Sequence, residues 1–191
     1  MNFDSALKRL DKLNLELINE QNIEKWSQDE QETLDPKDYI EQYLYIKTKD
    51  ARLDKLKLND PQAQIYNIIK KQRSLNKPIR IIVLKARQEG VSTLTEALIF
   101  EDTINRANIN SLIVAHDTDS SDRIFAMSKL YYDMLPDARK PATNYSNRKE
   151  LDFKAPLLSR IQVDTAGNTG VGRSFTLQNF HGSEVAFWKD A

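Results

Sequence analysis

The feature that most constrains this sequence is a run of apolar, mostly β-branched residues, IRIIVLK at 79–85, that leads into a helical pattern. A nearly unbroken apolar run of this length is typical of a strand buried on both faces, as in a parallel sheet. A helix is expected from about Ser92 to Ala107, and a second buried strand, SLIVAH, follows at 111–116. The strand–helix–strand order predicts an α/β fold with a mostly parallel sheet.

Further segments extend this alternation on both sides. Asp60 followed by Pro61 is a common helix start, with Asp as the cap and Pro as the first helical residue. The order of all these segments predicts a three-layer α/β sandwich. The further expected elements are a helix from Asp60 to about Arg73, a helix from Ser120 to Met134, and strands near 158–164 and 174–180.

Residues 1–59 are expected to form an N-terminal extension ahead of a core domain at 60–191. Leucines recur mostly at three- and four-residue spacing within 3–24, which predicts a helix. The polar stretch at 26–38 is expected to be a linker. Alternating side chains on both sides of a polar turn at 43–58 predict a β-hairpin.

The composition excludes several kinds of site and partner. The 191 residues include no Cys and two His, so disulfides, Cys-ligated zinc and thiolate catalysis are excluded, and a multi-His metal site is not expected. Lys plus Arg and Asp plus Glu number 28 each, so bulk charge does not predict tight nucleic-acid binding by one copy. No apolar run approaches the roughly 20 residues of a membrane span, and the N-terminus has no signal-peptide core. We therefore expect a cytoplasmic protein with no membrane partner.

The segment between the first predicted strand and its helix has the composition of a phosphate-binding loop, in which backbone N–H groups and a helix N-terminus converge on an anion. Gly90 and Ser92 are in register with the template G-x-x-x-x-G-K-[ST]. Lys85 stands at the first glycine position of that template, and Val91 stands at the lysine position. The candidate nucleotide-binding residues are Lys85, Ala86, Arg87, Gln88, Glu89, Gly90, Val91, Ser92 and Thr93.

The polar side chains of this loop suit separate tasks in phosphate chemistry. Lys85 could reach across the loop to the β- and γ-phosphates of ATP. Ser92, with Thr93 beside it, would supply the hydroxyl ligand of Mg²⁺. Arg87 could lie over the phosphates and act in cis. The alternative is an ordinary turn between strand and helix with charged side chains in solvent.

A second candidate site lies in FTLQNFHGSEVAFW at 175–188. An ATPase of this kind needs acidic groups after a strand, to hold the Mg²⁺ water shell and to orient the attacking water. Glu184 is the candidate base, and Ser183 stands where an Asp would order the Mg²⁺ shell. Arg173, flanked by glycine ahead of this strand, is a candidate arginine finger for a neighbouring subunit. The alternatives are a Glu that starts a surface helix and an Arg in a solvated turn.

Two other groups of polar residues have simpler explanations. Asp117, Asp119 and Asp122 follow the second buried strand. We expect them to be the N-cap and first-turn carboxylates of a helix rather than a metal loop. His116 and His181 have no catalytic arrangement around them in the sequence, and neither is assigned a role.

Three segments together resemble the ATPase domain of the large terminase subunit of tailed bacteriophages. They are RIIVLKARQEGVST at 80–93, SLIVAHDTDSSDRIFAM at 111–127 and GRSFTLQNFHGSEVAFW at 172–188, and the resemblance covers about residues 40–191. Its distinctive parts are the loop pattern K-x-R-Q-x-G-x-S-T and the ending S-E-x-A-[FY]-W. The resemblance implies a P-loop fold of the ASCE type with an atypical phosphate loop.

The resemblance also implies roles for individual residues. Lys85 corresponds to the phosphate lysine, and Arg87 occupies the arginine position of the loop. Glu184 corresponds to the catalytic glutamate, and Arg173 to a finger proposed to act in trans. The choice between a finger in cis and one in trans stays open. Ser183 departs from the usual Asp.

Gln64 resembles the glutamine that reads adenine in this family, with Gln62 as the alternative. The implied activity is hydrolysis of ATP with Mg²⁺, which drives double-stranded DNA into a viral prohead in the host cytoplasm. The implied partners are that DNA, gripped transiently by a ring of copies of the chain, together with the portal and the small terminase subunit.

Members of this family continue beyond the counterpart of Ala191 into a coupling motif and a nuclease domain, so the chain alone is expected to have weak or no turnover and no nuclease activity. Two alternatives remain open. One is a helicase-like P-loop ATPase that acts on nucleic acid outside packaging. The other is a nucleotide-binding fragment without turnover.

Overall fold

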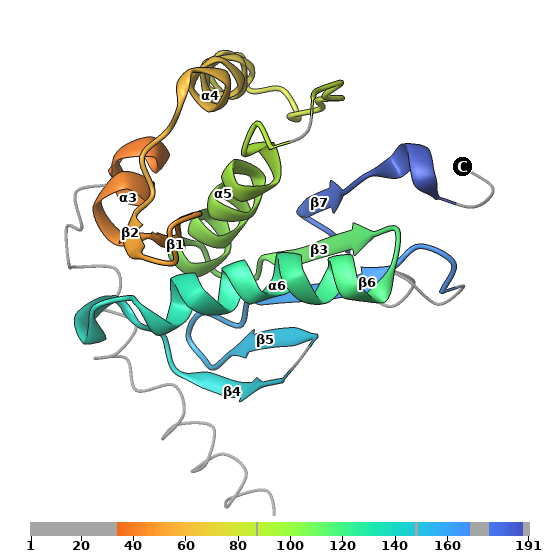
Figure 1. Ribbon diagram of the computed structural model, residues 1–191. Coiled ribbons are helices and arrows are strands. Elements are labelled where there is room, and N and C mark those ends of the chain that lie inside the picture. Colours follow the sequence, from red (N-terminus) through yellow and green to blue (C-terminus); the bar gives the residue numbers. More distant parts are fainter. Residues whose placement is uncertain (1–33, 87, 148, 169–175, 189–191) are drawn as a thin grey trace, which may run out of the picture.

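The computed structural model describes residues 34–86, 88–147, 149–168 and 176–188 (Figure 1). The helices are α3 (Pro36–Tyr43), α4 (Asp60–Ser74), α5 (Val91–Asn105) and α6 (Thr118–Asp133), with short 3-10 turns at Asp137–Arg139 and Val185–Phe187. The strands are β1 (Tyr45–Lys47), β2 (Leu53–Lys55), β3 (Asn110–Ala115), β4 (Thr143–Ser146), β5 (Glu150–Phe153), β6 (Arg160–Thr165) and β7 (Asn179–Gly182).

The central element of the fold is a five-stranded mixed sheet in the order β4-β5-β6-β3-β7. β3 runs parallel to both neighbours, so Ile113 lies opposite Val163 on one side and His181 on the other. β5 and β4 add to the β6 side in antiparallel order. The α/β class is therefore confirmed. The sheet was predicted to be mostly parallel, but it is mixed, because the short β4–β5 hairpin adds two antiparallel pairings that the sequence did not predict.

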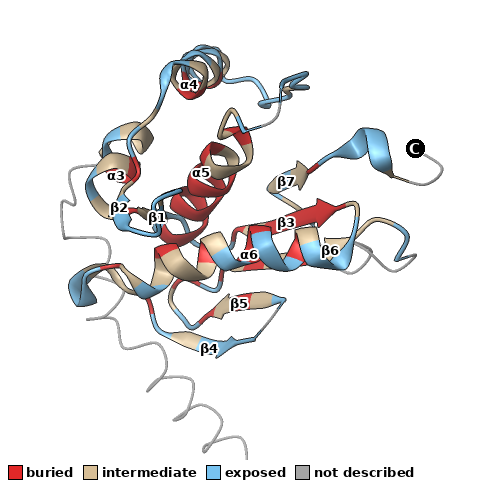
Figure 2. Cartoon of the chain, viewed as in Figure 1, coloured by how far each residue is buried: buried red, intermediate tan, exposed pale blue. Residues whose placement is uncertain are grey.

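α5 and α6 cover one face of this sheet. Phe100 of α5 and Tyr131 of α6 meet with their ring centroids 5.6 Å apart. Both belong to one core cluster with Ile113 and Val163 of the sheet. α5 and β3 are the most continuously buried elements in the view of Figure 2. Among the described residues, the helices in contact with the sheet share this face, so the third layer of the predicted sandwich is not part of the described structure.

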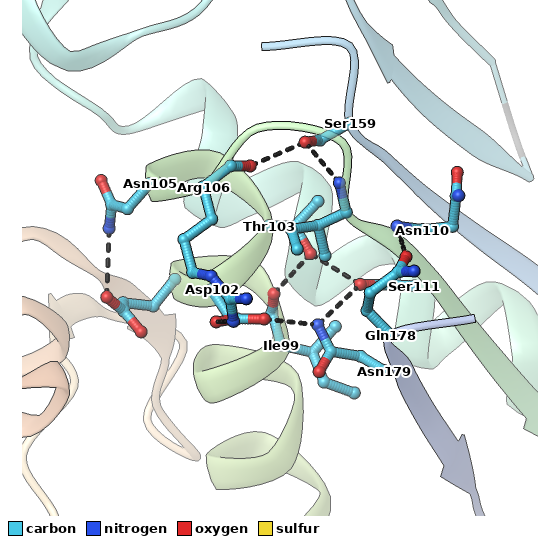
Figure 3. Close-up of polar contacts among 12 residues, drawn as sticks. Ile99, Asp102, Thr103, Asn105, Arg106, Asn110, Ser111, Ser159, Gln178 and Asn179 are labelled. Atoms are coloured by element: carbon cyan, nitrogen blue, oxygen red, sulfur yellow. Dashed lines mark hydrogen bonds and ion pairs between the residues drawn. The ribbon is translucent and has the colours of Figure 1, made fainter. Parts of the chain in front are cut away.

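The amino end of the sheet is closed by a network of hydrogen bonds between α5, β3 and β7 (Figure 3). The Thr103 and Ser111 hydroxyls are 2.7 Å apart. Asn179 Nδ2 donates to Asp102 Oδ2 at 2.8 Å and to Ser111 Oγ at 3.1 Å. Ser159 Oγ donates to the Arg106 carbonyl at 2.7 Å. Buried polar groups at this end are therefore paired within the protein, as burial requires.

The three helices predicted between residues 60 and 134 are present as α4, α5 and α6, with small changes at their ends. Asn59, rather than Asp60, caps α4 in a reciprocal capping box with Gln62, because an Asn side chain accepts the N3 amide well. Asp117 caps α6 and accepts a hydrogen bond from the Ser120 amide at 2.7 Å, as predicted. α3 begins at Pro36, inside the stretch that was predicted to be a linker.

The predicted hairpin is present as β1 and β2, which pair antiparallel with Ile46 opposite Asp54. β6 lies close to its predicted place, and β7 begins only at the end of the strand predicted at 174–180. The predicted N-terminal helix at 3–24 lies outside the described residues. No helix in the described ranges has both the length and the apolar content to cross a membrane.

The prediction of a strand at 79–85 is wrong. These residues form no strand, and the side chains of Ile82 and Leu84 are fully exposed. A strand needs a neighbouring backbone for its N–H and C=O groups. The described sheet ends at β7 and does not include this segment. The apolar run predicts burial, but most of its side chains are exposed here, and the pattern does not specify which backbone would pair with it.

Candidate functional site

The N-terminus of α5 has no side-chain cap. Its N-cap, Gly90, adopts a left-handed φ of 73°, which glycine takes without strain. A Cβ at that position would lie 2.7 Å from Gln62 Nε2. By contrast, Asp35, Asn59 and Asp117 cap the other three described α-helices through side-chain oxygens. In the described structure the first N–H groups of α5 therefore have no side-chain acceptor, which makes them available to an anion.

The loop before α5 is attached to α4 and to the hairpin. Gln62 Nε2 donates to the Gly90 carbonyl at 2.7 Å. Lys49 Nζ donates to Gln88 Oε1 at 3.1 Å, and Gln88 itself has a left-handed φ of 65°. The two left-handed residues turn the chain sharply into the helix. Lys85 is exposed at the beginning of this loop, and Arg87 lies outside the described residues.

The remaining loop residues divide into packed and accessible positions. Val91, at the template's lysine position, is buried, so this site is used for packing. Ser92 and Thr93 are half-buried at the first turn of α5. A hydroxyl in the first turn of an uncapped helix is well placed to meet whatever binds at that N-terminus.

An open depression of about 330 Å³ lies between α4 and the segment that leads into the loop. Its walls are mainly apolar, with Gln64, Lys85 and Glu89 as the polar groups. Gln62 is buried and fully engaged with the α4 cap and Gly90, so of the two candidate glutamines only Gln64 borders this depression. The lining residues are Pro61, Gln64, Ile65, Ile68, Val83, Leu84, Lys85, Ala86, Glu89 and Val91.

Ser183 and Glu184 follow β7 at the carboxyl edge of the sheet. Ser183 is buried, and its amide donates to the Val114 carbonyl at 2.8 Å. Glu184 has a left-handed φ of 54°, which is costly for a residue with a Cβ and is concentrated at functional sites. The Trp188 indole donates to the Ser183 carbonyl at 3.1 Å and so secures this turn. Arg173 lies outside the described residues.

Two contacts show that the loop and Glu184 lie at the same end of the sheet. Asp102 of α5 bonds to Asn179 at the start of β7, whereas Glu96, six residues earlier in α5, bonds to His181 near the end of β7. α5 therefore runs antiparallel to β7. Its N-terminus lies toward the edge where β7 ends. In the described ranges no hydrogen bond or ion pair joins residues 85–93 to 183–184 directly.

The Glu96–His181 contact is a buried polar link between α5 and β7. His181 Nδ1 lies 2.6 Å from Glu96 Oε1, and Ser128 Oγ donates to the other oxygen at 3.4 Å. Burial raises the pKa of the Glu96 carboxyl. This pair connects the helix that follows the loop to the strand that leads to Glu184.

His116 is a site residue that the sequence did not identify. Its Nε2 lies 2.6 Å from Asp117 Oδ2, and its Nδ1 lies 2.8 Å from Glu184 Oε2. The signal that could have identified it is its position at the carboxyl end of β3, but the pairing of β3 with β7 is a long-range contact that the sequence pattern does not give. The described residues contain no group of three or more His, Cys, Asp or Glu side chains arranged to hold a metal ion.

Comparison with protein-family models and with curated proteins finds no match to this chain.

Proposed function

We propose that this chain is a P-loop-type ATPase domain of the ASCE class that binds ATP with Mg²⁺ at the carboxyl edge of the sheet. The observation that carries the proposal is the uncapped, glycine-turned N-terminus of α5 beside Lys85. A helix start of this kind binds phosphate through backbone N–H groups and the helix dipole. The depression next to it, with Gln64 on its wall, is the proposed place of the adenine.

We assign a role to each of the groups at that edge of the sheet. Backbone N–H groups at the start of α5 and the Lys85 ammonium hold the phosphates. Ser92 and Ser183 would hold Mg²⁺, directly or through water, and hydroxyl and water oxygens are hard ligands that suit this ion. Glu184 orients a water for in-line attack, and Mg²⁺ would neutralise phosphate charge. Arg87 in cis or Arg173 from a neighbouring copy stabilises charge in the transition state.

The biological role that we propose is packaging of double-stranded DNA by a viral motor, on the strength of the terminase-like segments. In that role the chain acts in the host cytoplasm within a ring of copies that holds DNA and meets the portal and the small terminase subunit. A net charge of zero agrees with a DNA grip that is shared by several copies. A finger supplied in trans predicts that the ATPase rate per subunit rises with protein concentration.

Equilibrium binding of a slowly hydrolysed ATP analogue tests the proposal. Wild type should bind with Mg²⁺, and Lys85→Ala should lose at least about tenfold in affinity, or about 1.4 kcal/mol. Lys77→Ala is the matched control, because Lys77 is an exposed lysine that does not line the depression. Absence of Mg²⁺-dependent binding to the folded wild type, or equal losses in both variants, would contradict the proposal.

A further inference from the structure

His116 lies between two carboxylates at the carboxyl edge of the sheet. The distances are 2.6 Å from Nε2 to Asp117 Oδ2 and 2.8 Å from Nδ1 to Glu184 Oε2. The imidazole side chain is 26% exposed, and its Nδ1 atom is buried. One side of the ring therefore faces the proposed catalytic glutamate, and the other side faces an acid on a neighbouring element.

Asp117 holds the ring in place. Asp117 is the N-cap of α6, and its Oδ1 accepts a hydrogen bond from the Ser120 amide at 2.7 Å. Its other oxygen faces His116 Nε2. The Phe187 ring packs beside the imidazole, with a centroid distance of 5.9 Å. The ring cannot move far without disturbing a helix cap or an aromatic contact.

Glu184 is much less constrained than His116. Its side chain is 53% exposed. In the described part of the chain, the hydrogen bonds and ion pairs give its carboxylate one polar partner, which is His116. The Nδ1–Oε2 pair lies at ion-pair distance without the alignment of a hydrogen bond, and it is an ion pair when the imidazole is protonated. Without that partner, an exposed glutamate would sample several rotamers.

We propose that His116 is a positioning residue for Glu184. The chain Ser120 amide–Asp117–His116–Glu184 transmits the rigidity of the α6 cap to the carboxylate, in the way that an outer partner orients a ligand or a base elsewhere. The carboxylate is then already oriented when nucleotide and water arrive, and rotamer freedom is not lost during the reaction. This inference rests on the proposed function, because Glu184 has water to orient only if the chain hydrolyses ATP.

The two histidines of the chain make the contact directly measurable by NMR of the imidazole signals. Glu184→Gln should move the His116 ring signals and leave those of His181 unchanged. Asp117→Asn preserves the cap, since Asn and Asp are equally good N-caps, and should also move the His116 signals. Asp119→Asn changes another acid in the same turn and should move neither. If the His116 signals stay unchanged in Glu184→Gln, the proposal is overturned.

Turnover at saturating ATP and Mg²⁺ tests the catalytic consequence. His116→Ala should lower kcat by about tenfold to a hundredfold, part of what a positioned general base contributes, and leave analogue affinity within about twofold. His116→Asn, which places an amide N–H donor where the imidazole stood, should restore part of kcat. Equal kcat in wild type and His116→Ala overturns the positioning role. If the wild type binds nucleotide without turnover, the NMR comparison decides the proposal.

The failure of the underlying function would have a different signature. A folded wild type that binds no nucleotide overturns the proposed function, and the catalytic part of this inference falls with it. In that case the NMR comparison of Glu184→Gln with Asp119→Asn still decides whether His116 contacts Glu184.

Discussion

The two ends of the sheet satisfy their polar groups in opposite ways. At the amino end, side chains from α5, β3 and β7 bond to one another, as the Asp102–Asn179 and Thr103–Ser111 pairs show (Figure 3). At the carboxyl end, α5 begins without a side-chain cap, and the exposed Glu184 carboxylate meets only the His116 ring among the polar groups that the structure describes. The amino end, called the closed end below, has its polar groups paired within the protein. The carboxyl end, called the open end, leaves donors and acceptors for a ligand.

Function is therefore expected at the end that the protein leaves incomplete. Backbone groups that are buried without partners are costly, so a helix N-terminus without a side-chain cap is satisfied by water or by a bound anion. The same end carries the left-handed Gly90 and Glu184. The following predictions test this contrast, from the largest expected effect to the smallest.

Two phenylalanines should show the largest contrast in stability. Phe100 is completely buried against Tyr131, whereas Phe187 is 68% exposed at the open end. Phe100→Ala should lower the free energy of unfolding by about 3–5 kcal/mol, because it leaves a cavity in the core. Phe187→Ala should change it by less than about 0.5 kcal/mol. Denaturant unfolding measures both, and similar losses would show that the open end is packed after all.

The buried Glu101 of α5 should make the free energy of unfolding depend on pH. Burial raises the pKa of this carboxyl to about 7, so the folded state favours its neutral form. Below about pH 4.3, the pKa of a glutamate in the unfolded chain, Glu101 contributes its full stabilisation. This contribution is lost as pH rises toward 7, and the free energy of unfolding falls by about 3 kcal/mol in total. Glu101→Gln should remove this part of the pH dependence and be the more stable protein at pH 8. Identical pH profiles for the two proteins, measured by urea unfolding, would contradict this assignment.

A single hydroxyl should have a measurable effect at the closed end. Ser159 Oγ donates to the Arg106 carbonyl and accepts from the Ile109 amide, and the residue is completely buried. Ser159→Ala leaves both groups without that partner and should cost about 1–3 kcal/mol of unfolding free energy. The exposed Ser146→Ala on β4 is the matched control and should be nearly neutral. A neutral Ser159→Ala would mean that water replaces the hydroxyl and that this end is less closed than its hydrogen bonds indicate.

The smallest effect is expected in the apolar segment before the loop. Leu84 is fully exposed, so Leu84→Ser should change the free energy of unfolding by less than about 0.5 kcal/mol. A loss of more than about 1 kcal/mol would show that the segment is buried in solution, as the sequence predicted and as the structure does not show. Thermal unfolding of the two proteins at equal concentration separates these outcomes.

Local signals in the sequence predicted the parts of the fold that depend on local physics. The Asp117 cap, the helices α4 to α6 and the buried strand β3 follow from capping residues and from apolar patterning within one segment. The segment 79–85 shows the limit of that patterning, because an apolar run does not name the backbone that pairs with it. β4 is mostly exposed and polar, and β5 alternates over only four residues, so their period-two signal is too short to predict a hairpin.

The sequence allowed the loop of the candidate site to be located, but it did not predict the contacts that His116 and His181 make. Gly90 could be placed by its register with a phosphate-loop template, and the structure gives it the left-handed φ that such a turn uses. The contact of His116 with Glu184 depends on β3 and β7 being neighbours in the sheet, which is a pairing across more than sixty residues of sequence. The same reason explains why the buried Glu96–His181 pair was not expected.

The most direct test of the contrast is amide hydrogen exchange with and without a slowly hydrolysed ATP analogue and Mg²⁺. If the open end binds phosphate, exchange at residues 88–93 should slow by at least about tenfold, because bound phosphate occupies the first N–H groups of α5. Residues 103–111, at the closed end, should keep their rates. Unchanged exchange at 88–93 under saturating analogue, or slowing that is confined to 103–111, would contradict the account.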